Sequence, residues 1–250
     1  MLTKIAESLD GSPGDVVVEI GPGRGALTDE LVRRGFRVTA IEIDRDLVAQ
    51  LRDRYSDVPE VRIVAADVLD VPLGSLADSY RLVGNVPYYI TTPILFHALR
   101  PPLPLTAVFL VQKEVAERLA ATPASRAYGA LSVNVQATML VESLGRVKAG
   151  AFHPPPTVES AIVRLTPLAE PVVAAGNEQR LREFVIAVFG QRRKTMLRVL
   201  RHVRRISAVD AERALEAVGI SGARRPETLS PAEFASLQVA VDGSPPARRA

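Results

Sequence analysis

The chain has 250 residues, which suffices for one large domain or for a domain of typical size with a smaller companion. Apolar residues at 47% and charged residues at 24% predict a packed core, while no apolar run is long enough for a membrane span and the first residues lack the apolar centre of a signal peptide. The absence of cysteine excludes disulfides and thiolate metal sites, and three scattered histidines argue against a catalytic metal. We therefore expect a cytoplasmic protein with no metal and no membrane partner.

Strands and helices alternate along the first two thirds of the chain. In order, the pattern predicts a strand, a glycine turn and a helix in residues 15–35, a strand in 36–44, a helix in 45–55, strands in 61–70 and 80–89, a helix in 91–100, a strand and a helix in 105–121, at least one strand in 129–147 and a late strand in 159–168. Such alternation implies right-handed crossovers and a parallel sheet with helices on both faces, which is an α/β fold.

The pattern changes to helical spacing in the last third of the chain. Residues 179–203, 207–220 and 230–241 have this spacing, with Ser or Asp at plausible N-caps. We expect three parts: an α/β domain in 1–171, a small helical domain in 172–242 and a disordered tail in 243–250.

A glycine-rich turn follows the first predicted strand. The run "EIGPGRG" contains Glu19, Gly21, Gly23 and Gly25, and such a turn lets the backbone approach a ligand closely. A tight turn from strand to helix needs glycine in any case, so a purely structural role stays open. We expect these four residues to belong to a nucleotide-type cofactor site.

Acidic residues at the ends of the next two strands favour this interpretation. Glu42 stands 21 positions after Gly21, where an acid can accept both ribose hydroxyls, and Asp67 ends the third strand, where a carboxylate can accept an exocyclic amino hydrogen. Each acid alone is equally typical of a solvated strand end or an N-cap. A dinucleotide and S-adenosylmethionine both carry the required adenosine. The G-x-G-x-G spacing offers no cradle for a pyrophosphate, which favours S-adenosylmethionine.

The fourth predicted strand runs into "GNVPYYIT". Residues 85–88, Asn-Val-Pro-Tyr, resemble the (D/N/S)-P-P-(Y/F) signature of methyltransferases that modify exocyclic amino groups. The Asn85 side-chain oxygen and the Val86 carbonyl can accept the two N6 hydrogens of an adenine and aim its lone pair at a methyl group. Pro87 would stiffen the turn, and Tyr88 would stack on the base at about 1–3 kcal/mol. The alternative is a turn with a buried tyrosine; Tyr89 has no assignable role.

With these motifs the chain resembles one known family. The motifs are "VEIGPGRGALT", "IEID", "AADVL", "GNVPYYITTPILF", "LVQKEVAERLAA", "YGALSV", "FHPPPTVESAIVRL", "FGQRRKTMLRVL" and "RPETLSPAEFASL", between about residues 14 and 240. They are similar to the KsgA/RsmA family, the small-subunit ribosomal RNA adenine dimethyltransferases. The resemblance implies a Rossmann-like S-adenosylmethionine-dependent methyltransferase domain with a helical C-terminal domain.

The resemblance also implies a reaction and its residues. The reaction is the transfer of two methyl groups to N6 of each of two adjacent adenosines in the hairpin loop near the 3′ end of 16S RNA, in the small ribosomal subunit and coupled to its biogenesis. Gly21, Glu42, Asp67 and Asn85 fall on cofactor-contacting positions of the family, and Asn85, Pro87, Tyr88 and Phe152 on catalytic ones. Without the resemblance, Phe152 has the pattern of a core residue.

A basic segment lies in the predicted helical domain. Residues 192–205, "RRKTMLRVLRHVRR", contain seven Lys or Arg and no acid, although the net charge of the whole chain is only +3. A solvated helix face is the simpler interpretation, but mutual repulsion among these charges is relieved by a phosphate backbone. We expect RNA contacts from Arg192, Arg193, Lys194, Arg198 and Arg201.

Several alternatives stay open. The family normally carries a segment with a "GQNFL"-like motif before the first strand, and the start "MLTKIAESLDGSPGD" matches only the helix after it. This departure leaves open a late start assignment, a shortened chain, or a member without that lid, which would be a weakly catalytic or non-catalytic assembly factor of the small subunit. The Erm dimethyltransferases, which act on 23S RNA, share the first motifs, but the run 191–195 resembles the KsgA type. A DNA partner is not expected, because no target-recognition domain is evident.

Overall fold

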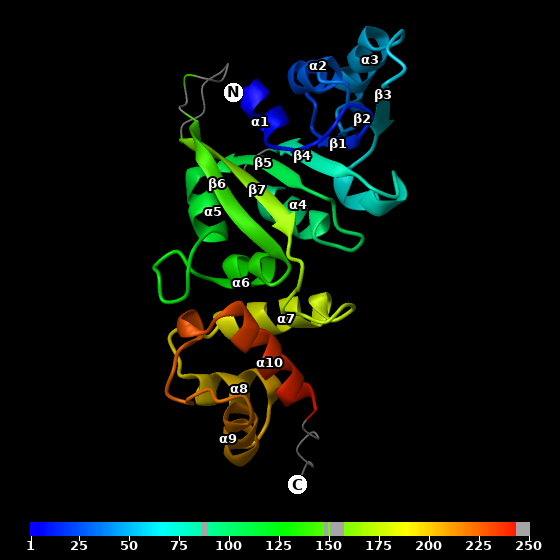
Figure 1. The fold of residues 1–250 in the computed structure, drawn as a ribbon. Coiled ribbons are helices and arrows are strands. Elements are labelled where there is room, and N and C mark those ends of the chain that lie inside the picture. Colours follow the sequence, from blue (N-terminus) through cyan, green and yellow to red (C-terminus); the bar gives the residue numbers. More distant parts are fainter. Residues whose placement is uncertain (87–89, 148–149, 151–157, 244–250) are drawn as a thin grey trace. The chain divides into compact units, whose positions relative to one another are not determined.

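The computed structural model describes residues 1–86, 90–147, 150 and 158–243. The chain divides into two compact units: Met1–Ala116 with Leu140–Pro167, and Glu117–Met139 with the chain from Leu168 onward (Figure 1). The first unit contains a sheet covered by helices and the second is helical, which confirms the predicted α/β fold with a helical C-terminal region. Among the described residues, no helix combines the length and the apolar character needed to cross a bilayer.

Seven strands form the sheet of the first unit, in the order β3-β2-β1-β4-β5-β7-β6. Their bounds are β1 Val16–Ile20, β2 Arg37–Glu42, β3 Val61–Ala65, β4 Arg81–Asn85, β5 Ala107–Gln112, β6 Met139–Val147 and β7 Ser160–Pro167. β1 to β5 pair in parallel, whereas β7 is antiparallel to β5. The prediction of a parallel sheet is therefore wrong at this edge. Alternation of side chains identifies a strand, but it is the same for either chain direction.

Helices follow β1, β2, β4 and β5 along the chain, as the sequence predicts, and one further helix precedes β1. They are α1 Leu2–Glu7, α2 Ala26–Arg33, α3 Arg45–Arg54, α4 Thr91–Ala98 and α5 Lys113–Leu119. Ile5 and Leu31 from α1 and α2 join strand residues such as Val17, Val38 and Val83 in one buried cluster. β1 is buried along almost its whole length, as expected of a central parallel strand that is covered on both faces.

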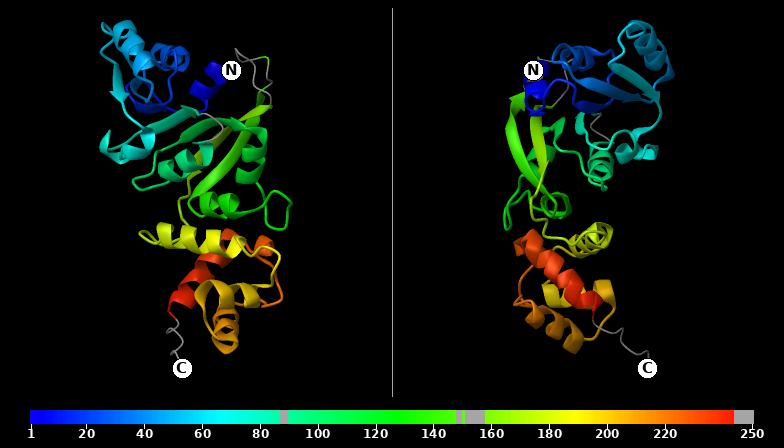
Figure 2. Two further views of the ribbon diagram at one scale, coloured as in Figure 1. Left: turned by 180° about the vertical axis from the view of Figure 1, so that it is seen from behind. Right: turned by 45° about the vertical axis from the view of Figure 1, so that its right-hand side comes forward.

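The second unit is a set of packed helices, one green and the others yellow to red in Figure 2. They are α6 Ala130–Gln136, α7 Glu178–Phe189, α8 Met196–Arg204, α9 Ala208–Ala217 and α10 Pro231–Asp242. Phe234 of α10 lies at the centre of an aromatic cluster, with its ring centroid 5.6 Å from that of Phe189 and 6.5 Å from that of Phe184. Ser207 and Ser230 cap α9 and α10 through their side-chain oxygens, as the sequence predicts.

Residues 117–139 group with the helices of the second unit. The Tyr128 hydroxyl, fully buried, donates a hydrogen bond to the Leu229 carbonyl at 2.8 Å. The boundaries expected from the sequence cut the chain once, near residue 172, and place this segment in the first domain. Contacts between segments about 100 positions apart leave no local pattern, so a single cut is what composition alone suggests. A methyltransferase domain and an RNA-binding domain with those boundaries stay predictions.

Candidate functional site

The predicted site residues lie at the carboxyl ends of the central strands. The glycine turn follows β1, Glu42 is the last residue of β2, and Asn85 is the last residue of β4. β1 pairs with both β2 and β4, so the order of the strands reverses between β1 and β4. Ligands of open α/β sheets bind at such a switch point. The structure thus brings the glycine turn, Glu42 and Asn85 to one edge of the sheet.

The glycine turn requires its glycines. Gly21, Gly23 and Gly25 have φ angles of 67°, 58° and 85°, a region that L side chains rarely adopt. A Cβ atom on Gly21 would lie 3.8 Å from the Asn85 backbone oxygen, whereas one on Gly23 would meet nothing within 4 Å. The turn therefore borders the end of β4 and has open space beside Gly23, into which a ligand can approach the backbone.

Glu42 links β2 to this turn. Its Oε2 accepts a hydrogen bond from the Gly23 amide at 3.3 Å, and its Oε1 accepts from the amides of Ile43 and Asp44 at 2.9 Å and 3.0 Å. The carboxylate is thereby held in one orientation although only 7% of the residue is exposed. Oε2, which faces the turn, has the greater remaining capacity to accept a ribose hydroxyl.

The other two predicted strand-end residues are less constrained. Asp67 lies two positions beyond β3, and its Oδ1 caps the 3₁₀ helix Val68–Asp70 by accepting from the Leu69 amide at 2.9 Å. Asp67 is therefore an N-cap, one of the roles that the sequence left open. Its Oδ2 has no hydrogen-bond partner among the described residues. The Asn85 side chain is exposed, and Val86 after it is 2% exposed.

Three of the four predicted catalytic residues lie outside the described residues. These are Pro87, Tyr88 and Phe152, and the same holds for Tyr89. Their roles stay predictions from the sequence. The helix after the Asn-Val-Pro-Tyr run is described, however, and His97 in α4 has its Nε2 2.8 Å from the Val71 carbonyl. This contact links α4 to the segment that follows Asp67.

Known proteins resemble this chain over nearly its whole length. The family described as "Ribosomal RNA adenine dimethylase" matches residues 1–238. The "Ribosomal RNA small subunit methyltransferase A" of Xanthomonas campestris pv. campestris (strain B100) is 43% identical over 239 residues, covering 94% of this chain and 89% of that one. The protein of the same name from Geobacter metallireducens is 41% identical over 248 residues, covering 96% and 90%. The chain belongs to the ribosomal RNA adenine dimethylase family.

Solved structures agree with this family and its fold. The 23S rRNA methyltransferase ErmE superposes with a TM-score of 0.72 at 30% identity, covering 96% of each chain. A dimethyladenosine transferase from Plasmodium falciparum superposes with a TM-score of 0.81 at 25% identity, covering 94% of this chain and 93% of that one. The resemblance, the Rossmann-like methyltransferase fold and the methyltransferase activity predicted from the motifs are thereby confirmed.

Glu19 of this dimethylase is buried in β1, just before the glycine turn. It is 1% exposed, and its Oε2 accepts a hydrogen bond from the Thr28 hydroxyl of α2 at 2.6 Å. Burial raises the pKa of the Glu19 carboxyl from 4.5 to about 7, and the nearby Asp29 and Glu42 act in the same direction. The carboxyl of Glu19 is therefore hydrogen-bonded to Thr28 of the neighbouring helix α2, and its contact with the cofactor stays a prediction.

Replacing Glu19 by glutamine is expected to change the pH dependence of stability. Because the folded pKa is raised, the stability that neutral Glu19 contributes is fully present below about pH 4.5 and is lost as the pH rises through about 7. The difference between the ordinary pKa of 4.5 and the folded pKa of about 7 corresponds to about 3 kcal/mol of unfolding free energy. In denaturant titrations without cofactor, the free energy of unfolding of Glu19→Gln should therefore rise relative to that of the wild type by about this amount between pH 4.5 and 8. The exposed Glu117→Gln is the control, and parallel pH profiles for Glu19→Gln and the wild type would contradict the assignment.

Ile43, beside Glu42, is an exposed residue that the sequence did not single out. It follows Glu42 directly and is 66% exposed, the largest exposure among the large apolar side chains described as exposed. An exposed isoleucine beside an acid at a strand end suits the apolar face of a flat base. The available signal was the apolar residue inside "IEID", which reads equally well as the end of a buried strand.

The basic segment forms a turn and a helix. The expected helical segment 179–203 breaks after α7, so Arg192, Arg193 and Lys194 lie on the connection before α8. Arg192 is partly engaged, since its Nε lies 3.8 Å from Glu227 Oε2 and a guanidinium nitrogen donates to the Arg126 carbonyl at 3.4 Å.

The exposed face of α8 carries the remaining charges. Arg198, Arg201 and His202 are exposed at helical spacing, Arg205 is exposed at the C-cap of α8, and Val199 and Leu200 are buried. We call residues 198, 201 and 205 the arginine stripe. In the described part of the chain these three make no ion pair, in contrast to Arg204, which pairs with Asp242 at 2.7 Å.

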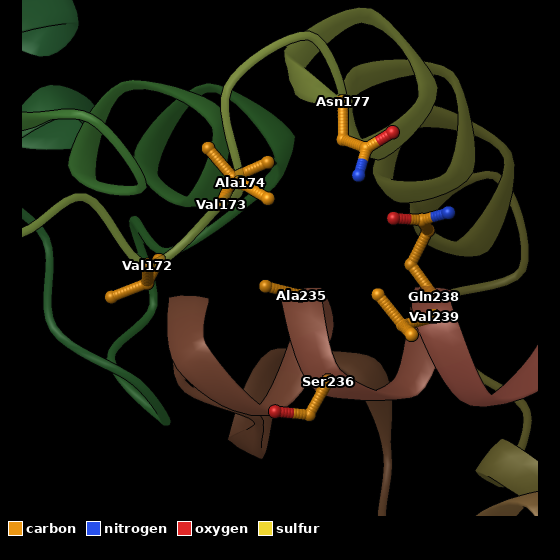
Figure 3. Close-up of a pocket in the computed structure, with 8 residues that line it drawn as sticks. All are labelled: Val172, Val173, Ala174, Asn177, Ala235, Ser236, Gln238 and Val239. Atoms are coloured by element: carbon orange, nitrogen blue, oxygen red, sulfur yellow. The ribbon is translucent and has the colours of Figure 1, made fainter.

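No group of three or more potential metal ligands occurs among the described residues. A cavity of about 380 Å³ lies in the second unit, between residues 172–177 and α10. Figure 3 shows Asn177 and Gln238 at one end of it, with Val172, Ala235 and Val239 among the apolar groups around it. It contains none of the predicted site residues and has no part in the strand-end site.

Proposed function

We propose that this chain methylates N6 of two adjacent adenosines in the small-subunit (16S) ribosomal RNA, as a step in subunit biogenesis. Two relatives named for the small subunit are 43% and 41% identical to it, against 30% for the 23S methyltransferase ErmE. This difference favours the small subunit over the Erm-like alternative. With ribosomal RNA as the substrate, we also propose that the protein acts in the cytoplasm.

The observation that carries the proposal is the position of Asn85. It ends β4 at the switch point, with its backbone oxygen beside the glycine turn and its side chain exposed. An exposed amide at this place can accept a hydrogen bond from an adenine amino group while a cofactor occupies the turn. Because that amino nitrogen is delocalised into the ring, bonds that hold its hydrogens favour a tetrahedral nitrogen with a directed lone pair.

S-adenosylmethionine suits the described residues. The open space beside Gly23 admits a ligand close to the backbone, and Glu42 holds an ordered carboxylate beside the turn, where an acid can accept ribose hydroxyls. Ile43 offers an apolar contact to the adenine, and Asp67 a free carboxylate oxygen for its amino group. When bound, the cofactor supplies an electrophilic methyl group on a sulfonium.

The chain's own groups then position the target base. Asn85 Oδ1 and the Val86 carbonyl each accept one N6 hydrogen, and Tyr88 and Phe152 stack on the two faces of the base, as the sequence predicts. Asparagine is a better choice than a strong base here, because the proton can leave after the methyl transfer. The turn residues 192–194 and the arginine stripe hold the phosphate backbone of the RNA.

Replacing Ile43 by alanine is expected to weaken cofactor binding. Losing most of the apolar contact that the bound cofactor would make with this side chain costs on the order of 1 kcal/mol, which is about a five-fold rise in the dissociation constant. Calorimetric titration with S-adenosylmethionine measures it. The control is Val209→Ala, an apolar residue of the second unit that is 62% exposed. Equal affinities for the Ile43 variant and the wild type would remove Ile43 from the site.

The choice of RNA is tested by offering both substrates. Small subunits and large subunits, each lacking adenine dimethylation, are incubated separately with the protein and S-adenosylmethionine carrying a labelled methyl group. We expect label in 16S RNA and background label in 23S RNA. The reverse distribution would establish the Erm-like alternative instead.

A further inference from the structure

The glycine turn is contacted by the last turn of α3, a segment outside every motif singled out in the sequence. Arg54 is the last residue of α3 and Tyr55 is its C-cap. One guanidinium nitrogen of Arg54 donates to the Arg24 carbonyl at 3.1 Å, and the Tyr55 hydroxyl lies 3.0 Å from the Gly25 carbonyl oxygen. The Arg24 carbonyl thus accepts a hydrogen bond from a helix about 30 positions later in the chain, and the Tyr55 hydroxyl of that segment lies against the next carbonyl of the turn.

Tyr55 also fills the space above Gly25. A Cβ atom on Gly25 would lie 2.4 Å from the Tyr55 hydroxyl oxygen and 3.3 Å from a methyl carbon of Leu51. Gly25 therefore has two reasons to be glycine, its φ of 85° and the tyrosine packed on it. Tyr55 itself is only 8% exposed, so its ring has a fixed place.

Asp29 completes the arrangement from α2. Its Oδ1 lies 2.7 Å from the Tyr55 hydroxyl, and its Oδ2 pairs with the Arg54 guanidinium. Burial and the hydrogen bond to Asp29 raise the pKa of the Tyr55 hydroxyl above its ordinary value, which keeps it a hydrogen-bond donor. The Asp29 amide also donates to the Gly25 carbonyl at 2.9 Å, so the same oxygen is approached from both helices.

We propose that Tyr55, Arg54 and Asp29 form a clamp that holds the glycine turn in its cofactor-binding conformation, and that these positioning residues set the affinity for S-adenosylmethionine. Glycines lose more backbone freedom on ordering than other residues, and this turn contains three of them. If the turn samples other conformations, the apparent dissociation constant rises in inverse proportion to the competent fraction. The clamp keeps that fraction high before the cofactor arrives. This inference rests on the cofactor of the proposed function.

The direct test is Tyr55→Phe in the full chain. Phenylalanine keeps the ring over Gly25 and removes only the hydroxyl. We expect the dissociation constant for S-adenosylmethionine, measured by calorimetry without RNA, to rise about three- to ten-fold, the size of one lost hydrogen bond to a charged or backbone acceptor. KM for the cofactor should rise by the same factor, while KM for the RNA and kcat at saturating cofactor stay unchanged.

Tyr80→Phe is the matched control. Tyr80 is also buried and donates to a backbone carbonyl, that of Pro102, at 3.1 Å. It precedes β4 and so lies at the amino end of the strand, away from the site. We expect both variants to lose thermal stability and only Tyr55→Phe to lose cofactor affinity. Equal cofactor affinity of Tyr55→Phe and Tyr80→Phe would overturn the clamp.

A second variant tests the contribution of the acid. Asp29→Asn removes the charge that attracts both Arg54 and the Tyr55 hydroxyl while keeping the shape of the side chain. In a double-mutant cycle the cofactor affinities of Asp29→Asn and Tyr55→Phe should be non-additive, because both act on the same turn. Additive effects would contradict a joint clamp. Failure of the wild type to bind S-adenosylmethionine at all would overturn the proposed cofactor, whereas normal binding with no methylation of RNA would contradict only the proposed reaction.

Discussion

Asn85→Ala is expected to lower the rate of methyl transfer by about 100- to 1000-fold, which is typical of losing one polar group that acts mainly in the transition state. Asn85 stands at the exposed end of β4, beside the glycine turn. Its side-chain oxygen is the acceptor that directs the lone pair of the target nitrogen, and alanine offers no replacement. Single-turnover kinetics at saturating S-adenosylmethionine and RNA isolate this step.

The Asn85→Ala variant should keep its affinity for RNA. RNA affinity is expected to change less than about three-fold, because the phosphate contacts that dominate it lie elsewhere. Asn177→Ala, at the N-cap of α7, is the control for an asparagine outside the site. A single-turnover rate for Asn85→Ala within three-fold of the wild-type rate would exclude Asn85 from the chemistry.

Removing two members of the arginine stripe is expected to weaken RNA binding by about 10- to 100-fold at low salt and to reduce the salt dependence. Arg198 and Arg201 lie one helical turn apart on the exposed face of α8 and make no ion pair among the described residues. If each contacts one phosphate, Arg198→Ala with Arg201→Ala reduces the slope of log affinity against log salt by about 1.4 to 1.8. Titrations of unmethylated 16S RNA at several salt concentrations measure both quantities.

The control carries the same change in net charge. Arg37 and Arg62 are exposed at the amino ends of β2 and β3, away from the strand-end site, so Arg37→Ala with Arg62→Ala should keep nearly the wild-type slope. An unchanged slope in the stripe variant, or an equal loss in both variants, would mean that α8 is a solvated face.

The strand-end site could be predicted because its elements are local in the sequence. A glycine turn after a strand, an acid at the end of the next strand and an asparagine at the end of the fourth each have a short signature, and parallel topology brings the ends together. The position of Glu42 agrees with this expectation, since its carboxylate accepts a hydrogen bond from the Gly23 amide of the turn, while its contact with a cofactor stays a prediction.

The features that could not be predicted depend on contacts between distant segments. Tyr55 reads as the end of an amphipathic helix, and nothing near it in the sequence indicates that its hydroxyl reaches Gly25 and Asp29. Tyr128 likewise reads as part of the loop before α6, yet its bond to Leu229 places that segment with the C-terminal helices. The hydrogen bond between Glu19 and Thr28 of α2 also has no local signature, while the contact of Glu19 with the cofactor stays a prediction.

The most direct test of the proposed reaction is the identity of the methylated nucleoside. Small subunits lacking the modification are incubated with the full chain and S-adenosylmethionine, and the 16S RNA is digested to nucleosides and analysed by mass spectrometry. We predict N6,N6-dimethyladenosine at two adjacent positions, absent when Asn85→Ala replaces the wild type. Subunit binding without methyl transfer, or methyl groups on any other nucleoside, would contradict an adenine N6 site at the end of β4.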